Sequence, residues 1–122
     1  MPYSIDISED RSYIVITLKG KFESHQAIEF ADISHELAKT TGIQSLLVDL
    51  YECRNIQSEQ ENYDMINKDF DGHPSVDRRT KIALYVHPDD HSHDFTQSVA
   101  QSDGHNIRIF RDRAEAITFL KS

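Results

Sequence analysis

Three short runs of almost uninterrupted apolar residues constrain the fold of this chain more than any other feature. They are residues 13–18 (YIVITL), 46–50 (LLVDL) and 81–86 (KIALYV). A strand with one face in water alternates apolar and polar residues, whereas a strand covered on both faces is apolar at nearly every position. The three runs therefore predict central strands of one sheet that has helices on its faces.

Helical patterns lie between these strands. Ser24 is placed to cap a first helix and Gly42 to end it. The expected inner stripe of this helix is Ala27, Phe30, Ile33 and Leu37. Ser58 and Glu61 form an S-x-x-E capping box, in which each side chain accepts a hydrogen bond from the backbone N–H of the other residue. The second helix should end at Gly72. Its expected stripe is Tyr63, Ile66 and Phe70.

The two ends of the chain complete the pattern. Residues 3–7 alternate apolar and polar side chains, and a short turn joins them to the strand at 13–18. This arrangement favours an antiparallel hairpin. The C-terminal part adds three predicted elements: a weak helix around Phe95 and Val99, an alternating strand at 106–110 near a sheet edge, and a helix that starts at Asp112.

The predicted order is β-β-α-β-α-β-α-β-α, in one α/β domain that comprises residues 1–122. Four strands are each followed by a helix, which implies a mostly parallel sheet, while the first strand joins as an antiparallel edge strand. The carboxyl ends of parallel strands meet at one edge, where such proteins usually bind ligands and partners. That edge should contain residues 19–22, 51–58, 87–91 and 111–113.

Charge and composition exclude several classes of protein. With 21 Asp and Glu against 13 Lys and Arg, the net charge of −8 repels nucleic acid and anionic membrane surfaces. No apolar run approaches the length of a membrane span, and the N-terminus lacks the pattern of a signal peptide. Cys53 is the single cysteine, which excludes an internal disulfide and agrees with a reducing compartment. We expect a cytoplasmic protein with no nucleic-acid partner and no integral membrane segment.

Two parts of the sequence, taken with the order of elements, resemble a known family. One is LLVDLYECRNIQSEQ at 46–60, and the other is TKIALYVHPDD at 80–90 with IRIFRDRAEAITFL at 107–120. They are similar to the STAS domain of bacterial anti-sigma-factor antagonists, which has the SpoIIAA-like fold. The C-terminal part resembles the uncharacterised SpoIIAA-like branch at Phe110, Glu115, Ala116, Phe119 and Leu120. The resemblance implies a non-catalytic regulatory domain that binds a protein partner.

The resemblance also directs attention to Ser58. In the signalling antagonists of the family, a partner kinase phosphorylates a serine in the motif Asp-Ser-Ser-Gly at the start of the helix after the middle strand. Residues 57–60 here read Gln-Ser-Glu-Gln, so only Ser58 of that motif remains. We interpret Ser58 first as a structural N-cap and second as a switch, while Glu59 already places a negative charge in the first turn. The related CRAL-TRIO domains imply an alternative function, the binding of a small apolar ligand or lipid.

Residues 87–94, HPDDHSHD, raise the possibility of a metal site. His87, His91 and His93 with the neighbouring aspartates are potential zinc ligands. However, His91 and His93 are two residues apart and share no helix face, and the spacing matches no zinc signature. Aspartates after Pro88 are equally typical of a loop and a helix start. We therefore predict a loop and cap, with no metal ion and no cofactor.

Cys53 is expected in the loop before the second helix. A thiol beside His87 could serve a metal- or thiol-dependent enzyme, but no C-x-x-C motif or family signature surrounds it, so we predict a bystander thiol and no catalytic residue. Arg78 and Arg79 should be solvated at the opposite edge. Arg111 lies at the carboxyl edge, where it could bind an anionic group or form a surface salt bridge.

The residues expected to contact a partner or ligand are Tyr51, Cys53, Ser58, Glu59, His87, Asp89 and Arg111. The leading hypothesis is a protein partner bound through residues 51–65, with a homodimer as a further option. An exposed apolar patch beside Ser58 would favour this hypothesis. An apolar pocket of several hundred Å³ at the carboxyl edge would favour a small ligand instead.

Overall fold

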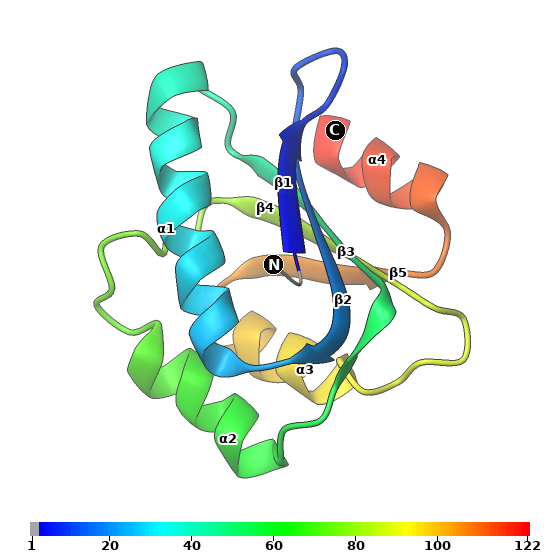
Figure 1. The fold of residues 1–122 in the computed structure, drawn as a ribbon. Helices are drawn as coiled ribbons and strands as arrows, with labels where there is room; N and C mark the ends of the chain where they lie inside the picture. The colour runs from blue at the N-terminus through cyan, green and yellow to red at the C-terminus, as the bar shows by residue number, and fades with distance from the viewer. Residues whose placement is uncertain (1–2) are drawn as a thin grey trace.

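The computed structural model describes residues 3–122, in which strands and helices alternate in the predicted order (Figure 1). The elements are β1 (Tyr3–Ile7), β2 (Ile14–Phe22), α1 (Ser24–Thr41), β3 (Ser45–Asn55), α2 (Glu59–Asp64), the π-helical segment η1 (Met65–Asp69), β4 (Lys81–Val86), α3 (Asp94–Ser102), β5 (Asn106–Phe110) and α4 (Arg113–Lys121). The strands form one sheet in the order β1-β2-β3-β4-β5. β1 pairs antiparallel with β2, and all other pairs are parallel. The predicted α/β fold with one antiparallel edge strand is confirmed.

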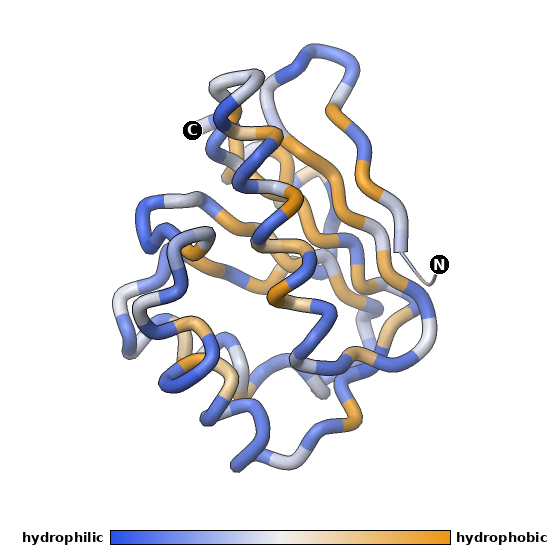
Figure 2. Tube along the Cα trace, turned by 60° about the vertical axis from the view of Figure 1, so that its left-hand side comes forward, coloured by the Kyte–Doolittle hydropathy of each residue, from blue (hydrophilic) through white to orange (hydrophobic). Residues whose placement is uncertain are grey.

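The sheet has an apolar core on each face. Leu47 and Ala83 are fully buried beneath Ala116 and Leu120 of α4. The other face carries Ile16, Leu18, Leu50 and Leu84 and is covered by α1, η1 and α3. In Figure 2 the chain is coloured by hydropathy, and hydrophobic (orange) and hydrophilic (blue) stretches follow one another along it. Burial of one large aliphatic side chain contributes about 1.5–3 kcal/mol, so the apolar strand runs are a main source of stability.

The central strand β3 is longer than predicted and contains an irregularity. It has 11 residues and continues to Asn55. Its register against β2 shifts between Thr17 and Lys19, where β3 accommodates one additional residue. A β-bulge of this kind changes which side chains face inward. Cys53 is consequently only 1% exposed, and the prediction that it lies in a loop is wrong.

Two residues assigned to apolar helix stripes are exposed instead. Ile33 is 38% exposed because the buried face of α1 passes through Phe30 and Ser34. Tyr63 is 49% exposed, whereas Met65 and Ile66 are buried. The chain changes from α-helix to π-helix at Met65, and the wider π turn alters the positions that face the core.

The beginning of α1 also differs from the prediction. Glu23, not Ser24, is the N-cap, and Gln26 completes a capping box with it. Ser24 is engaged elsewhere, since its backbone N–H and its hydroxyl both donate to Oε1 of Gln57, at 2.8 and 2.7 Å. Gly42 ends the helix as predicted, in the left-handed conformation with φ of 79°. The contact with Gln57 connects the start of α1 to the segment that leads into α2.

Candidate functional site: the loop network and the start of α2

The loop between β4 and α3 contains a buried carboxylate, Asp90, which is 2% exposed. Its Oδ1 accepts a hydrogen bond of 2.9 Å from the backbone N–H of Ser92. His93 Nε2 lies 3.5 Å from Oδ2, and the guanidinium of Arg54 lies 3.6 Å from Oδ1. Burial acts to raise the pKa of Asp90, but the hydrogen bonds from Ser92 and the charges of His93 and Arg54 outweigh it and lower that pKa overall. Asp90 therefore organises the loop, and α3 begins only at Asp94.

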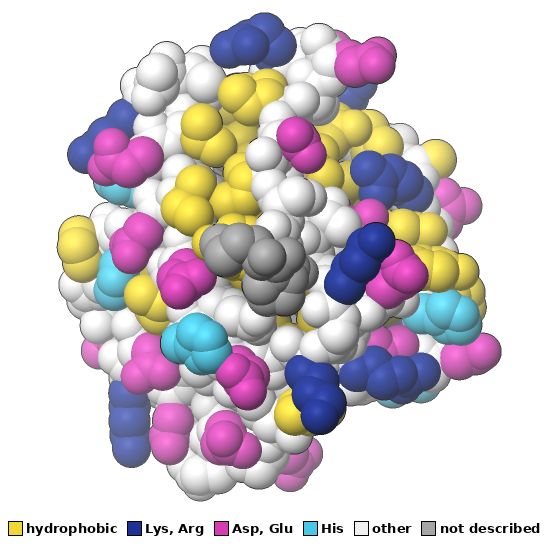
Figure 3. All heavy atoms as spheres, viewed as in Figure 1, with side chains coloured by type: hydrophobic (Ala, Val, Ile, Leu, Met, Phe, Trp, Pro, Cys, Tyr) yellow, Lys and Arg dark blue, Asp and Glu magenta, His cyan; other side chains and the backbone are white. Residues whose placement is uncertain are grey.

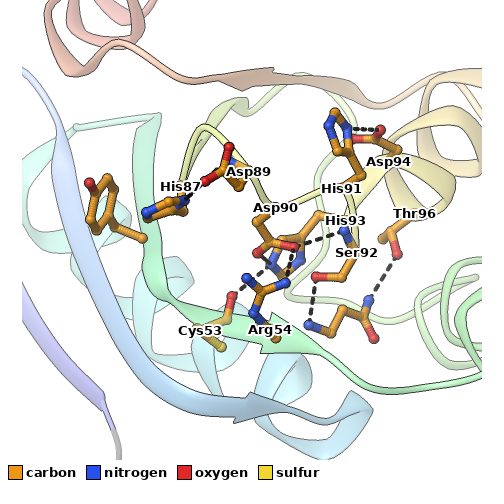
Figure 4. A network of polar contacts seen from close by, with 12 residues as sticks. Cys53, Arg54, His87, Asp89, Asp90, His91, Ser92, His93, Asp94 and Thr96 are labelled. Carbon is orange, nitrogen blue, oxygen red and sulfur yellow. Dashed lines mark hydrogen bonds and ion pairs between the residues drawn. The ribbon is translucent and has the colours of Figure 1, made fainter.

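Backbone groups of β3 hold this loop in place (Figure 4). His93 Nε2 lies 2.9 Å from the carbonyl oxygen of Cys53. Because a carbonyl only accepts, the proton of the imidazole is on Nε2 in this contact. The hydroxyl of Ser92 accepts a hydrogen bond of 3.0 Å from the backbone N–H of Asn55. His93 is thus a structural residue whose Nε2 is already engaged.

Asn55 extends the network to α2 and α3. Its side-chain amide donates to Asn62 Oδ1 at 2.8 Å and to Thr96 Oγ1 at 3.2 Å. The amide of Asn62 donates in turn to the carbonyl of Ser58 at 3.0 Å. Removing one partner from a buried hydrogen bond costs about 1–3 kcal/mol, so this network holds the start of α2 in one position on the sheet.

The N-terminus of α2 combines the predicted cap with exposed apolar side chains. Ser58 Oγ accepts from the backbone N–H of Glu61 at 3.1 Å, and Glu61 Oε1 accepts from the backbone N–H of Ser58 at 2.9 Å. Ile56 is 58% exposed and Tyr63 is 49% exposed. We refer to Ile56, Ser58, Glu59 and Tyr63 as the α2 surface.

A hollow beside the α2 surface is acidic. It lies between the starts of α1 and α2, and its lining includes Glu23, Glu61, Asp64 and Asp69 together with His25 and Ile56. Figure 3 shows acidic side chains gathered over the lower part of the molecule, where α2 lies in Figure 1. A partner that binds here would need positive charge around an apolar centre.

Cys53 does not have the environment of a nucleophile. Its side chain is buried, and burial, followed by the negative charge of Asp90, raises the pKa of the thiol to about 11. Reactive cysteines have a lowered pKa and partial exposure. These properties favour the bystander interpretation of Cys53.

Tyr51 and His87 lie together, but on the α4 side of the sheet. Their rings are 4.9 Å apart, and Tyr51 also stacks on Tyr85 at 5.4 Å. Tyr85 packs with the α4 core, whereas Cys53 belongs to the core on the α1 side. The predicted site residues are therefore divided between the two faces of the sheet.

Arg111 anchors the outer part of the 87–93 loop. Its guanidinium donates to the carbonyl of Asp90 at 2.8 Å and lies 3.5 Å from Asp94. His91 Nδ1 lies 3.0 Å from Asp94 and 3.2 Å from Arg111. The histidines of this segment contact different partners (Figure 4), and within residues 3–122 no group of three or more His, Cys, Asp or Glu side chains is arranged to hold a metal ion.

The remaining predicted residues have separate environments. The side chain of Asp89 is 86% exposed, and Glu59 is exposed in the first turn of α2. Arg78, expected to be solvated, donates to the carboxylate of Asp103 at 2.6 Å and to its carbonyl at 2.8 Å. Arg79 is paired with Asp77 at the surface.

Two residues of the α2 surface, Ile56 and Tyr63, were not predicted as site residues, because the sequence carries no signal for the exposure of an apolar side chain.

Comparisons with solved structures identify the fold. An anti-sigma factor antagonist from Mycobacterium paratuberculosis has a TM-score of 0.59 at 8% identity, over 98% of this chain and 93% of the other. An uncharacterised protein from Shewanella loihica with a SpoIIAA-like fold has a TM-score of 0.57 at 16% identity, over 97% and 91% of the two chains. The unphosphorylated form of the anti-sigma factor antagonist SpoIIAA has a TM-score of 0.52 at 15% identity, over 98% of both chains. The chain therefore has a SpoIIAA-like fold, as its sequence patterns indicated.

Sequence comparisons add no further relative: no family model matches the chain, and no curated protein matches it. Among residues 3–122, no helix has both the length and the apolarity needed to cross a bilayer.

Proposed function

We propose that this chain is a non-catalytic regulatory domain that binds a protein partner through the α2 surface. The observation that carries the proposal is the exposure of Ile56 and Tyr63, at 58% and 49%, on either side of the capped Ser58. Large apolar side chains at the surface contribute to affinity when a partner covers them. The network of Asn55 and Asn62 beneath them supplies the rigid support that a binding surface needs.

Charge defines the class of partner. The hollow next to the α2 surface contains Glu23, Glu61, Asp64 and Asp69, and the chain as a whole carries a net charge of −8. A complementary surface would present Lys or Arg around an apolar centre. Two of the similar structures are anti-sigma factor antagonists, and this supports regulation through a protein complex as the general role.

Ser58 acts in this proposal as a cap and not as a phosphorylation switch. Its hydroxyl already accepts the N–H of Glu61, and Glu59 and Glu61 occupy the first turn. A phosphate added among these carboxylates would be repelled, although the helix N-terminus itself favours negative charge. The cap is therefore the role that the local charges support.

Site-specific photo-crosslinking in cells tests the proposal. A photoreactive amino acid is placed at position 56 or 63, and at position 118 as a control on the exposed side of α4. We expect one and the same protein to be captured from positions 56 and 63 and not from position 118, and Ile56→Asp to abolish its capture from position 63. Capture from position 51 but from neither 56 nor 63 would instead identify the aromatic cluster on the α4 side as the binding surface.

A further inference from the structure

The two faces of the central strands differ in how well they are covered. On the α4 face, Leu47 and Ala83 are 0% exposed. On the α1 face of the same strands, Leu46, Val48 and Ile82 are only half-buried. A mostly parallel sheet normally has both faces covered by helices. The half-buried apolar residues therefore indicate incomplete filling of the space between α1 and the centre of the sheet.

The composition and position of α1 account for this space. The helix packs toward the edge of the sheet, where Phe30 meets Tyr3 with ring centroids 4.8 Å apart. Most of the α1 side chains that line the space beside the central strands are small, namely Ala27, Ala31, Ser34 and Ala38, while Phe30, His35 and Lys39 line it as well. The result is an apolar chamber of about 390 Å³, bounded by α1, by the central strands and by Met65 and Ile66 at η1. Ligand pockets occupy about 300–1,000 Å³.

Apart from Ser34 in the middle of α1, whose hydroxyl donates to the carbonyl of Phe30, two sets of polar groups line the chamber at its two ends and differ in character. Asn55, His93 and Thr96, at the carboxyl ends of the strands, are buried and bonded within the loop network. Lys39 and Arg79, at the amino ends of the strands, are exposed. The chamber therefore opens between the end of α1 and the segment before β4, at the edge opposite to the one that the sequence predicted.

Two cationic side chains lie at this opening, each beside a carboxylate. Lys39 Nζ lies 3.6 Å from the carboxylate of Glu36, and Arg79 is paired at 3.0 Å with Asp77, which also lines the chamber together with His35. Nearby, His105 lines the chamber with a buried Nε2 that has no hydrogen-bond partner among the described residues; Asp103 Oδ2 is 3.3 Å away but does not satisfy it. Ion pairs at an exposed surface contribute little stability, so an anionic group at the opening can compete for Lys39 and Arg79.

We propose that the chamber binds one single-chain amphiphile with a carboxylate head, its apolar chain lying over Leu46, Val48 and Ile82 and its head at Lys39 and Arg79. Burial of one methylene group is worth about a fourfold gain in affinity. Binding of a series of saturated fatty acids should therefore tighten by about this factor for each added methylene, until the chain outgrows the chamber. This site is independent of the α2 surface, which lies at the other edge of the sheet.

Isothermal titration calorimetry with decanoate, laurate and myristate tests the proposal, with native mass spectrometry to count the bound molecules. We expect one fatty acid per chain and the length dependence given above. Ala31→Met and Ala38→Met fill the chamber with residues of good helix propensity, so they should weaken laurate binding at least tenfold without lowering thermal stability. Ala114→Met, on the exposed side of α4, is the matched control and should bind as the wild type does.

A second pair of variants changes the size of the chamber by a single methyl group, so that misfolding does not confuse the result. Val48→Ile adds one methyl group to the chamber wall and should shorten the longest fatty acid that binds, whereas Val15→Ile, on the α4 face, should not.

A charge variant tests the position of the head group. Lys39→Gln should weaken the binding of laurate severalfold but leave the binding of dodecanol unchanged. Lys68→Gln, whose lysine has a similar helix position and a similar carboxylate contact, should change neither.

Four results would overturn the proposal: no binding by the wild type, binding that Ala31→Met and Ala38→Met leave intact, dodecanol binding as tightly as laurate, or binding of diacyl phospholipid vesicles in place of the free acid. Crosslinking at positions 56 and 63 is measured separately. A failure of either proposal is therefore distinguishable from a failure of the other.

Discussion

His93 and Asp90 form a buried contact, with His93 Nε2 3.5 Å from Asp90 Oδ2 and both side chains almost completely excluded from solvent. The same nitrogen lies 2.9 Å from the carbonyl oxygen of Cys53. This relationship explains why a stretch rich in histidine and aspartate is a structural loop. Asp90 and His93 are directed at β3 and at one another, and they fix the loop against the central strand.

Asp90→Asn should lower the free energy of unfolding by about 1–3 kcal/mol near neutral pH, because the variant loses the charge that faces His93 and Arg54. The pKa of Asp90 is lowered in the folded protein, so its contribution is present above the unfolded value of about 3.9 and is lost as pH falls through the folded value. Urea unfolding at a series of pH values should show a gap between wild type and variant that closes in acid. Asp89→Asn, on an exposed side chain, should show no gap at any pH.

Ser58→Ala should cost about 1 kcal/mol of stability, whereas Ser58→Asp should cost almost nothing, because aspartate caps a helix as well as serine does. Chemical unfolding of both variants measures these differences. If Ser58 is only a cap, crosslinking of the partner at position 63 stays unchanged in both variants. Loss of the partner in Ser58→Asp alone, at unchanged stability, would establish Ser58 as a switch.

Cys53 should react with iodoacetamide at least a hundredfold more slowly in the folded protein than in urea, because its thiol is buried and its pKa is about 11. The raised pKa also has a consequence for stability. The unfolded thiol ionises from about pH 8.5, while the folded thiol remains protonated up to about pH 11. The stabilising contribution is therefore complete below pH 8.5 and is lost between these values. Cys53→Ser should show a smaller loss of stability across this alkaline range, and rapid native labelling of Cys53 would contradict the prediction.

Untagged protein should contain no stoichiometric zinc. His91 contacts Asp94 and Arg111, and His93 contacts the carbonyl of Cys53, so their nitrogens do not converge. Elemental analysis after dialysis measures the metal content. About one zinc per chain, lost in the double variant of His87→Ala and His91→Ala, would show that these side chains rearrange around an ion.

The sequence by itself determined the element order, the parallel sheet with its antiparallel edge strand, and the capping box of Ser58 and Glu61. These features follow from local patterns: the continuous apolarity of a doubly covered strand, the reciprocal hydrogen bonds of a cap, and the left-handed conformation that Gly42 adopts. Each depends on residues that are neighbours in the chain, so each has a signal that can be predicted.

The tertiary structure decided where side chains point beyond Leu50 and what lies between the layers. One additional residue in β3 turns Cys53 and Asn55 inward, and it depends on pairing with β2, which lies more than twenty residues earlier in the chain. The exposure of Ile56 and Tyr63 and the chamber beneath Ala31 and Ala38 likewise depend on how far each helix lies from the sheet. Such distances result from packing between remote segments, and no local pattern of apolar and polar residues specifies them.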